Sequence, residues 1–388
     1  MKPIYYNKQS INNQDEKSII SVLHHDKITT GKVVDKFEKN ISNFTSAKYV
    51  VTSTNATSSI HLSLVSINLK KNDIVIMPSI NFISAFNMCQ FMQAKVYLAD
   101  VDPITGQMTP ENLFECIKKN KLSKIKAVIS MYLGGSPENV IELYKLKKKY
   151  KFILIEDACH AFGASYKHKN KLYKVGSCRH SDICTFSFHP VKPITTGEGG
   201  ALTTNNPIFA KKAKLYRSHN IIRHKNRHWI YDIKSFGMNY RLSDINCALG
   251  NSQLKRINSF LKIRKKISKM YDKNLSKFKN FIKTANYNKN SSYHLKILIF
   301  NFSKLKCNKN EVFDYFKKKG IFLQYHYIPI YLFKIGRKYS NFNIFHGANK
   351  YYRTAISFPI HCNLTKKQFE KIIQTLTLFI KKYSKRNA

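Results

Sequence analysis

The sequence is poor in acidic residues and lacks long hydrophobic runs. Only 22 of its 388 residues are Asp or Glu, against 67 Lys and Arg, and the formal net charge is +45. No run of 18 or more apolar residues occurs, and the first residues lack the hydrophobic stretch of a signal peptide. We therefore expect a cytoplasmic protein with no membrane partner.

The excess of positive charge raises the question of nucleic-acid binding. The lysines are spread over the whole chain, and they accompany many Asn and Ile residues. An AT-rich genome favours codons for these three residue types, so codon bias can account for much of the excess of lysine. We therefore expect no nucleic-acid partner. A nucleic-acid-binding protein is the alternative from a different class, and it would need no cofactor and would lose affinity steeply with salt. In either case a positive field attracts anionic ligands.

The cysteine spacings typical of zinc sites are also missing. The chain has eight cysteines and no Cys-x-x-Cys pair; the closest two, Cys178 and Cys184, have no second close pair beside them. Scattered thiols in a chain that is not secreted are most simply reduced core residues. We expect no metal site.

The first two thirds of the chain alternate short apolar runs with helical stretches. Strands are predicted at residues 49–52, 73–77, 95–99, 127–131, 152–156 and 183–188, and helices at 57–69, 85–92, 109–119 and 137–149. Several runs are continuously apolar, which is typical of strands buried on both faces. The alternation predicts an α/β fold with a large, mostly parallel sheet.

The pattern changes near residue 250. A long basic helix is predicted at 253–278, followed by a β-rich run at 294–302, a helix at 310–319, a Tyr-rich segment at 324–333 and an amphipathic helix at 366–381. We therefore predict a large domain over residues 1–250 and a smaller C-terminal α+β domain over 251–388.

In an open α/β sheet, functional residues gather at the carboxyl ends of the strands. The first such end is the hydroxyl-rich turn from Thr52 to Ser59, which leads into a helix. Backbone N–H groups at a helix N-terminus form an anion site, most often for phosphate. A plain helix cap has the same composition, so this turn by itself is a weak signal.

The second strand end carries Asp157, directly after an apolar run. Burying a carboxylate there is costly without a cationic partner, and a protonated pyridine nitrogen would be one. An aspartate that only caps the next turn is the alternative.

The third strand end is the most informative. Residues 186–200 read Phe-Ser-Phe-His-Pro-Val-Lys-Pro-Ile-Thr-Thr-Gly-Glu-Gly-Gly, with Lys192 among apolar neighbours. A desolvated lysine has a lowered pKa and becomes a Schiff-base nucleophile. The glycines let the backbone turn sharply and approach other groups closely. The stretch is neither a Walker loop nor a dinucleotide fingerprint.

On these motifs the chain, from Tyr6 to Phe379, resembles the DegT/DnrJ/EryC1/StrS family of pyridoxal 5'-phosphate (PLP)-dependent sugar-nucleotide aminotransferases. The resemblance implies the type I, aspartate aminotransferase-like PLP fold. It implies that Lys192 binds PLP as a Schiff base and then carries a proton, while Asp157 keeps the pyridine nitrogen protonated. Ser187 and the turn Ala56-Thr57-Ser58 would hold the phosphate.

The same resemblance gives roles to three further residues. Phe82 matches the aromatic residue that stacks on the cofactor ring, although a core Phe is the alternative. His160 stands where many relatives have Gln, beside the phenolic oxygen of the ring. Asn239 matches the Asn that reaches the cofactor phosphate of the partner subunit, which implies a homodimer with shared active sites.

Within the family, the resemblance is to the branch that moves an amino group from L-glutamate to C4 of a UDP-4-keto-6-deoxy-N-acetylhexosamine in pseudaminic acid biosynthesis. It implies UDP-sugar contacts from Ala56, Ser187, Asn239 and the following: Tyr6; Asp26, Lys27, Ile28 and Thr29; Tyr325, His326, Tyr327 and Ile328. Lys27 and His326 could add charge-assisted bonds to the diphosphate. Packing of the small domain is the alternative for the Tyr-rich segment.

Other nucleotide keto-sugars, of the legionaminic acid, bacillosamine or perosamine type, are the alternative substrates. PLP-dependent sugar dehydratases share the fold but replace the lysine with His, so Lys192 argues against them. Two departures from the family pattern are Asn55, where Ser is usual, and Asn220, where Gly is common. Asn tolerates left-handed backbone, so the second change need not disturb its turn.

Overall fold

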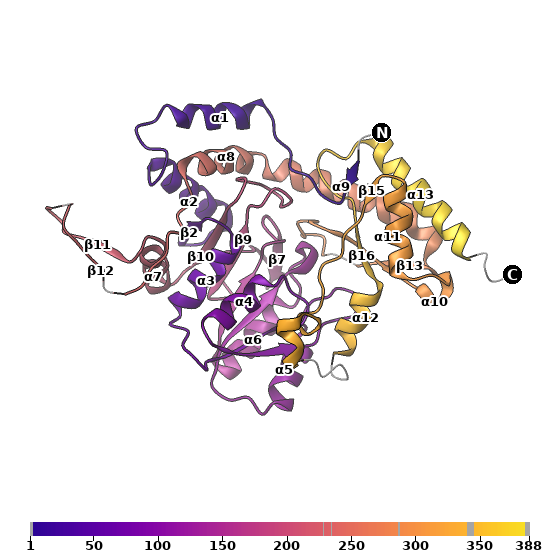
Figure 1. Cartoon of the computed structure of the whole chain (residues 1–388), viewed down its shortest axis with the longest axis horizontal. Helices are drawn as coiled ribbons and strands as arrows, with labels where there is room; N and C mark the ends of the chain where they lie inside the picture. The colour runs from indigo at the N-terminus through magenta and orange to yellow at the C-terminus, as the bar shows by residue number, and fades with distance from the viewer. Residues whose placement is uncertain (1–2, 228, 234, 286–287, 340–344, 385–388) are drawn as a thin grey trace.

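The computed structural model describes residues 3–227, 229–233, 235–285, 288–339 and 345–384 (Figure 1). Its centre is a seven-stranded sheet in the order β2-β10-β9-β6-β5-β3-β4. The strands are β2 (Tyr49–Ser53), β3 (Ile74–Pro78), β4 (Lys95–Ala99), β5 (Ile125–Met131), β6 (Ile153–Asp157), β9 (Ile183–Ser187) and β10 (Gly200–Thr204). Only β10 runs against the others, so six strands end at one edge of the sheet.

Both faces of this sheet are buried, as the apolar runs predict. Along β3, Val75 and Met77 belong to one cluster of core residues, whereas Ile76 between them belongs to another. Because successive side chains of a strand point to opposite faces, these clusters lie on opposite faces of the sheet. A continuous apolar run along one strand therefore contributes core residues to both faces of the sheet.

Two helices of the large sheet region show the capping residues that the sequence contains. Asn55 accepts a hydrogen bond from the Ser58 N–H at 2.9 Å and caps α3 (Ala56–Ser66). Thr109 caps α5 (Pro110–Lys119), as the sequence predicts. The other helices here are α1 (Asn13–Leu23), α2 (Lys32–Thr45), α4 (Ser84–Phe91), η1 (Leu133–Gly135), α6 (Val140–Tyr150), α7 (Pro207–Arg217) and α8 (Asp244–Lys255).

The C-terminal part builds a three-stranded antiparallel sheet, in the order β13-β14-β16, and packs helices against it. Its elements are α9 (Ile257–Leu275), η2 (Ser276–Phe278), β13 (Ile282–Thr284), β14 (Lys296–Phe300), α10 (Phe302–Leu305), α11 (Lys309–Lys318), β15 (Ile321–Phe322), η3 (Ile330–Leu332), η4 (Lys334–Tyr339), α12 (His346–Thr354), β16 (Ala355–Phe358) and α13 (Lys366–Ser384). The first strand of the chain, β1 (Ile4–Tyr5), pairs with β15. The N-terminal arm thus crosses to the C-terminal part.

The single basic helix predicted at 253–278 is wrong. Helix α8 ends at Lys255, and α9 begins at Ile257 after a break at Arg256. Helix α9 is amphipathic, whereas α8 is buried on all sides from Cys247 to Leu254, so the break lies where the burial pattern changes. Residue 250 lies inside α8, which packs against α1 and α2, and the buried residues change from one core cluster to the next within α9. The domain division at 250 stays a prediction.

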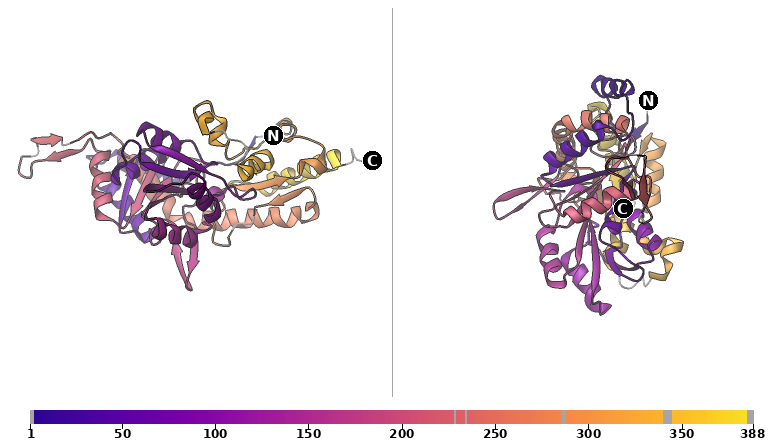
Figure 2. Two further views of the ribbon diagram at one scale, coloured as in Figure 1. Left: turned by 90° about the horizontal axis from the view of Figure 1, so that it is seen from below. Right: turned by 90° about the vertical axis from the view of Figure 1, so that its left-hand side faces the viewer.

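Two hairpins project from the body of the molecule (Figure 2). They are β7–β8 (Ser165–His168 and Lys171–Lys174) and β11–β12 (Ile221–Arg223 and Tyr231–Ile233). No helix among the described residues has the length and hydropathy needed to cross a membrane.

Candidate active site

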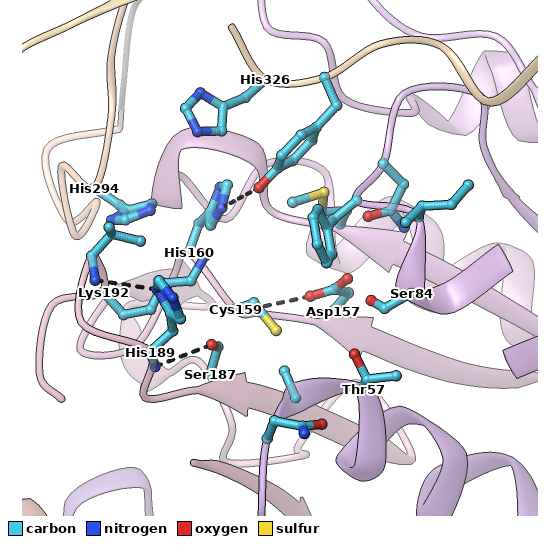
Figure 3. Close-up of a pocket in the computed structure, with 18 of the residues that line it drawn as sticks. Thr57, Ser84, Asp157, Cys159, His160, Ser187, His189, Lys192, His294 and His326 are labelled. Atoms are coloured by element: carbon cyan, nitrogen blue, oxygen red, sulfur yellow. Dashed lines mark hydrogen bonds between the residues drawn. The ribbon is translucent and has the colours of Figure 1, made fainter. Parts of the chain in front are cut away.

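A cavity of about 710 Å³ lies at the edge where the parallel strands end. The ends of β2, β3, β5, β6 and β9 each contribute to its wall, and the segment 324–328 of the C-terminal part closes it. Figure 3 shows its labelled polar side chains converging on one space. Twelve residues predicted from the sequence line it: Tyr6, Ala56, Thr57, Phe82, Asp157, His160, Ser187, Lys192, Tyr325, His326, Tyr327 and Ile328.

Lys192 is held in a tight loop after β9. Its backbone N–H donates to the carbonyl of His189 at 2.8 Å. The loop turns at Gly197, whose φ is +79°, and a side chain at Gly200 would lie 2.5 Å from the carbonyl of Asn55. Burial lowers the pKa of the Lys192 amine, while Cys159 and Asp157 act in the opposite direction. Lys192 is therefore a cavity residue with a lowered pKa, and not a solvated surface lysine.

Asp157 is a buried carboxylate at the end of β6, only 2% exposed. It accepts a hydrogen bond from the backbone N–H of Cys159 at 3.2 Å, and it forms no ion pair with another described residue. Burial raises its pKa, which hydrogen bonding to Cys159 and the charge of Lys192 partly offset. A protonated pyridine nitrogen would supply the missing cationic partner.

The start of α3 faces the cavity, as an anion site requires. Ala56 and Thr57 line the cavity at this helix N-terminus, opposite Ser187 from β9. The hydroxyl of Ser58 is bonded to Thr54 Oγ1 at 2.9 Å, and its N–H is taken by the Asn55 cap. A contact of Ser58 with phosphate therefore stays a prediction.

Phe82 and His160 lie on the walls of the same cavity. Phe82 is 51% exposed, so it is not a core Phe, and its ring centre is 5.6 Å from that of Tyr327. His160 Nδ1 accepts a hydrogen bond from the Gly134 N–H at 3.3 Å, and its Nε2 lies 2.9 Å from the Tyr327 hydroxyl. Burial and the positive charge of Lys192 hold the pKa of His160 well below its usual range, so the ring is neutral.

His326 is a neutral side chain in the cavity wall. Burial lowers its pKa to about 3, and its Nδ1 lies 2.9 Å from the hydroxyl of Ser357. The ring is thus neutral near pH 7. Because a neutral imidazole N–H can still donate to an anionic diphosphate, the contact of His326 with the diphosphate stays a prediction.

Among the buried polar residues of the cavity wall that were not predicted are Asn81 and His294. Asn81 and His294 are each 1% exposed, and their polar side-chain atoms form no hydrogen bond with another described residue. The ring of His294 packs on that of His160, with centres 4.3 Å apart. The sequence around neither residue shows a spacing that marks a binding site. Only the fold brings them to the cavity.

Six predicted residues lie outside the lining of this cavity, namely Ser58 and the five described next. The exposed loop of Asp26, Lys27, Ile28 and Thr29 runs beside the start of α8, where Thr29 forms a β-bridge with Ser243 and the Asp244 N–H donates to the Ile28 carbonyl at 2.9 Å. Asn239 is exposed and bridges Ser218 at the base of the β11–β12 hairpin. Asn220, beside it, has a φ of +57°, the left-handed backbone expected of an Asn in place of Gly.

The residues present fit PLP, which is the cofactor of this enzyme. A lysine of lowered pKa, a buried carboxylate without a cationic partner and a helix N-terminus surround one cavity. When bound, PLP supplies an electron sink for transfer of an amino group. No group of three or more His, Cys, Asp or Glu side chains in the described part of the chain is placed to hold a metal ion.

The chain is similar to known aminotransferases. A UDP-4-amino-4,6-dideoxy-N-acetyl-beta-L-altrosamine transaminase of Campylobacter jejuni is 36% identical over 98% of this chain and 99% of its own. The structure of Helicobacter pylori PseC, an aminotransferase of pseudaminic acid biosynthesis, superposes with a TM-score of 0.89 at 28% identity, covering 98% and 100% of the two chains. The PLP form of a sugar aminotransferase from Streptococcus pneumoniae shares the fold, with a TM-score of 0.87, 24% identity and coverage of 98% and 99%. Residues 9–377 match the pattern of one family, and the chain belongs to the DegT/DnrJ/EryC1/StrS aminotransferase family.

Proposed function

We propose that this aminotransferase moves an amino group from L-glutamate to C4 of a UDP-4-keto-6-deoxy-N-acetylhexosamine in pseudaminic acid biosynthesis. The product would be UDP-4-amino-4,6-dideoxy-N-acetyl-beta-L-altrosamine, the sugar nucleotide for which the C. jejuni relative is named. The observation that carries the proposal is the joining of Lys192 and Asp157 to the Tyr-rich segment 325–328 in one cavity. Tyrosine rings offer an apolar face together with a hydroxyl, which suits a sugar nucleotide.

Each residue would act through its own chemistry. Lys192 would bind the cofactor covalently and afterwards carry a proton, since its lowered pKa makes a neutral amine accessible. Asp157 would hold a proton on the pyridine nitrogen. The N–H groups at Ala56 and Thr57, together with Ser187, would bind the phosphate. Phe82 would stack on the ring.

Sharing of the active site between two subunits has structural support. The β11–β12 hairpin projects from the body and exposes large apolar side chains, including Trp229 at 66% and Tyr231 at 55% (Figure 2). Such residues suit a partner surface better than water. Asn239 lies at the base of this hairpin and outside the cavity of its own chain, so we infer that it serves the cofactor phosphate of a partner subunit in a homodimer.

The loop Asp26–Thr29 would join the same shared site. Thr29 of this loop forms a β-bridge with Ser243, which is four residues beyond Asn239. The loop and Asn239 would therefore contribute to the same site. Lys27 is exposed there, and its ammonium group can pair with the negative charge of the diphosphate. Glutamate and the keto-sugar would use the cavity in turn.

The test is a panel of UDP- and GDP-linked 4-keto sugars offered with L-glutamate, with the amino-sugar product identified by mass and NMR spectroscopy. Amination of the UDP-4-keto-6-deoxy-N-acetylhexosamine alone or best is the expected result. Preference for a GDP sugar or for another epimer would show that one of the alternative sugars is the substrate. Absence of amination of every sugar would overturn the proposal.

A further inference from the structure

The side chain of His294 is buried in the cavity wall without a hydrogen-bond partner among the described residues. It is 1% exposed, and neither ring nitrogen forms a hydrogen bond there. Its backbone, by contrast, is bonded at both ends: the N–H donates to the Gly134 carbonyl at 3.0 Å, and the carbonyl accepts from Arg264 Nη1 at 3.3 Å. An unpaired buried polar group costs free energy, so such a group in a folded protein calls for an explanation. A ligand in the cavity would supply the missing partner.

The ring of His294 is a neutral donor. Burial is the main cause that holds its pKa well below the usual range of histidine, and the positively charged Lys192 and Arg264 are among the neighbours that add to the effect. A neutral imidazole carries one N–H donor and one acceptor nitrogen. In His160 the Gly134 N–H determines which nitrogen is the acceptor, whereas no described group determines it in His294. The ring hydrogen of His294 can therefore sit on whichever nitrogen faces a ligand.

The protein behind His294 is positively charged. Arg264 is 2% exposed, and its guanidinium donates to the carbonyl of His294 at 3.3 Å and to that of Ile360 at 2.9 Å. A third bond goes to Asn7 Oδ1 at 2.9 Å, and Arg264 forms no ion pair with another described residue. A buried cation without a carboxylate is costly, and an anion held nearby would offset part of that cost. The wall at His294 therefore favours a negatively charged ligand.

The place of His294 in the cavity indicates which anion this is. Its ring packs on that of His160, with centres 4.3 Å apart, on the side of the cavity where Lys192 lies (Figure 3). The amino group that reacts must lie beside Lys192, and in an amino-acid donor the α-carboxylate is attached to the carbon that bears this group. The keto-sugar has no charged group on the carbons beside C4, and its diphosphate is attached across the ring at C1. No arginine of the described chain lines the cavity, so an α-carboxylate there depends on Lys192 and on neutral donors.

We propose that this wall of the cavity binds the α-carboxylate of the amino-acid donor, and that His294 donates its ring N–H to that carboxylate. The proposal deepens the proposed function and rests on it for the identity of the donor, L-glutamate. Arg264, behind the carbonyl of His294, adds its positive charge without touching the ligand. The contact distinguishes the two substrates that use the cavity in turn, because only the amino acid has a charged group on its reacting carbon.

The experiment compares two amino compounds that bind the PLP-loaded enzyme without turnover. α-Methyl-L-glutamate and 4-amino-4-methylpentanoate both lack a hydrogen on the carbon that bears nitrogen, so neither can be transaminated, and the second has a methyl group in place of the α-carboxylate. Binding is read from the absorbance of the bound cofactor. His294→Phe keeps a ring to pack on His160 and removes both nitrogens. We expect it to weaken α-methyl-L-glutamate about tenfold to a hundredfold, the effect of a hydrogen bond to a charged group, and to leave 4-amino-4-methylpentanoate unchanged.

Three controls accompany this comparison. UDP, measured by calorimetry, should bind His294→Phe as it binds the wild type. His25→Phe, in the exposed turn after α1, is the matched control and should change no binding constant. His294→Asn and His294→Gln each retain an amide N–H, and at least one of them should keep the preference for the α-carboxylate. If His294→Phe does not load PLP, His294→Leu takes its place.

Equal weakening of the two amino compounds by His294→Phe would overturn the contact, as would weakening of UDP to the same extent or no weakening at all. A wild-type enzyme that binds α-methyl-L-glutamate no more tightly than 4-amino-4-methylpentanoate would overturn it too. Loss of the preference in both amide variants would remove the ring N–H from this role. The proposed function fails separately, if the wild-type enzyme aminates no UDP-4-keto sugar.

Discussion

Asp157 and Lys192 face one buried cavity with opposite charges, and each reduces the effect of burial on the other. Burial raises the pKa of Asp157, and the charge of Lys192 opposes that rise. Burial lowers the pKa of Lys192, and Asp157 is one of two groups that oppose it. The two residues come from successive parallel strands, β6 and β9, whose ends are neighbours in the sheet. The interaction of Asp157 with Lys192 therefore depends on the order of the strands in the sheet.

Lys192 is expected to be the residue that binds PLP covalently. Reduction of the enzyme with borohydride, followed by peptide mapping, should place the pyridoxyl adduct on Lys192. Lys192→Ala should retain the fold by circular dichroism and lose all turnover, because both covalent binding and the proton carrier are removed. Lys211→Ala, on the exposed side of α7, is the control and should remain active. An adduct on any other lysine would contradict the assignment.

Asp157→Asn is expected to bind PLP and to transaminate slowly. A neutral amide cannot stabilise a protonated pyridine nitrogen, so the rate should fall by roughly two to three orders of magnitude, as for loss of one strong electrostatic contact. Single-turnover absorbance measurements with glutamate would record it. Asp35→Asn, an exposed residue in the first turn of α2, should leave the rate unchanged. A rate near that of the wild type in Asp157→Asn would remove Asp157 from this role.

Asn239 is expected to complete the site of the partner subunit. Chains with Lys192→Ala and chains with Asn239→Ala should each be inactive. Their mixture should regain activity, because a heterodimer then contains one site with both residues intact. Exchange of subunits should be verified with differently tagged chains. If exchange occurs and the mixture stays inactive, Asn239 acts within its own chain.

Lys27→Ala is expected to affect only the sugar half of the reaction. Lys27 is exposed and outside the cavity lining, so PLP absorbance and the glutamate half-reaction should be unchanged. KM for the keto-sugar should rise about tenfold, since a charge-assisted bond to phosphate contributes roughly 1.5 kcal/mol. Lys17→Ala, on exposed α1, is the control. Equal slowing of both halves would indicate that the loop supports the fold instead.

The ion pair of Glu38 and Arg217, which links α2 to α7, is expected to stabilise the folded protein. Glu38 Oε1 accepts from Arg217 Nη1 at 2.6 Å and from the Thr52 N–H at 2.9 Å, and so joins α2, α7 and β2. Arg217→Met should lower the free energy of unfolding by about 3 kcal/mol, because a buried carboxylate loses its closest cation. Urea unfolding measures the change. The double variant with Glu38→Leu should recover most of the loss; if it does not, lost packing by the Arg217 stem explains the effect.

Stability is expected to fall in mild acid because of His361. Burial lowers its pKa to about 4, whereas an unfolded His has a pKa of 6.5, so the unfolded chain binds the extra proton between these values. Stability is therefore lost progressively as pH falls from 6.5 towards 4, by roughly 2 kcal/mol for this residue at pH 5. His361→Asn should reduce the difference between urea midpoints at pH 7.5 and pH 5. An unchanged difference would show that His361 is accessible to protons in the folded state.

The sequence by itself determined the parts of the protein that depend on neighbouring residues. Strands β3 and β6 follow from short, continuously apolar runs, and the start of α5 follows from Thr109 and Pro110. The motif around Lys192 predicted that this lysine is shielded from water and acts as a Schiff-base nucleophile. These features are local, since periodicity, caps and motifs are properties of a few consecutive residues.

Tertiary structure decided what depends on residues far apart in the chain. His160 and Tyr327 are separated by 167 positions, and no local pattern shows that their side chains meet. Asn81 and His294 reach the cavity because the loops that carry them are folded over it. The neutral state of His326 likewise follows from burial, because the cost of charge depends on the surrounding atoms and not on the residue type.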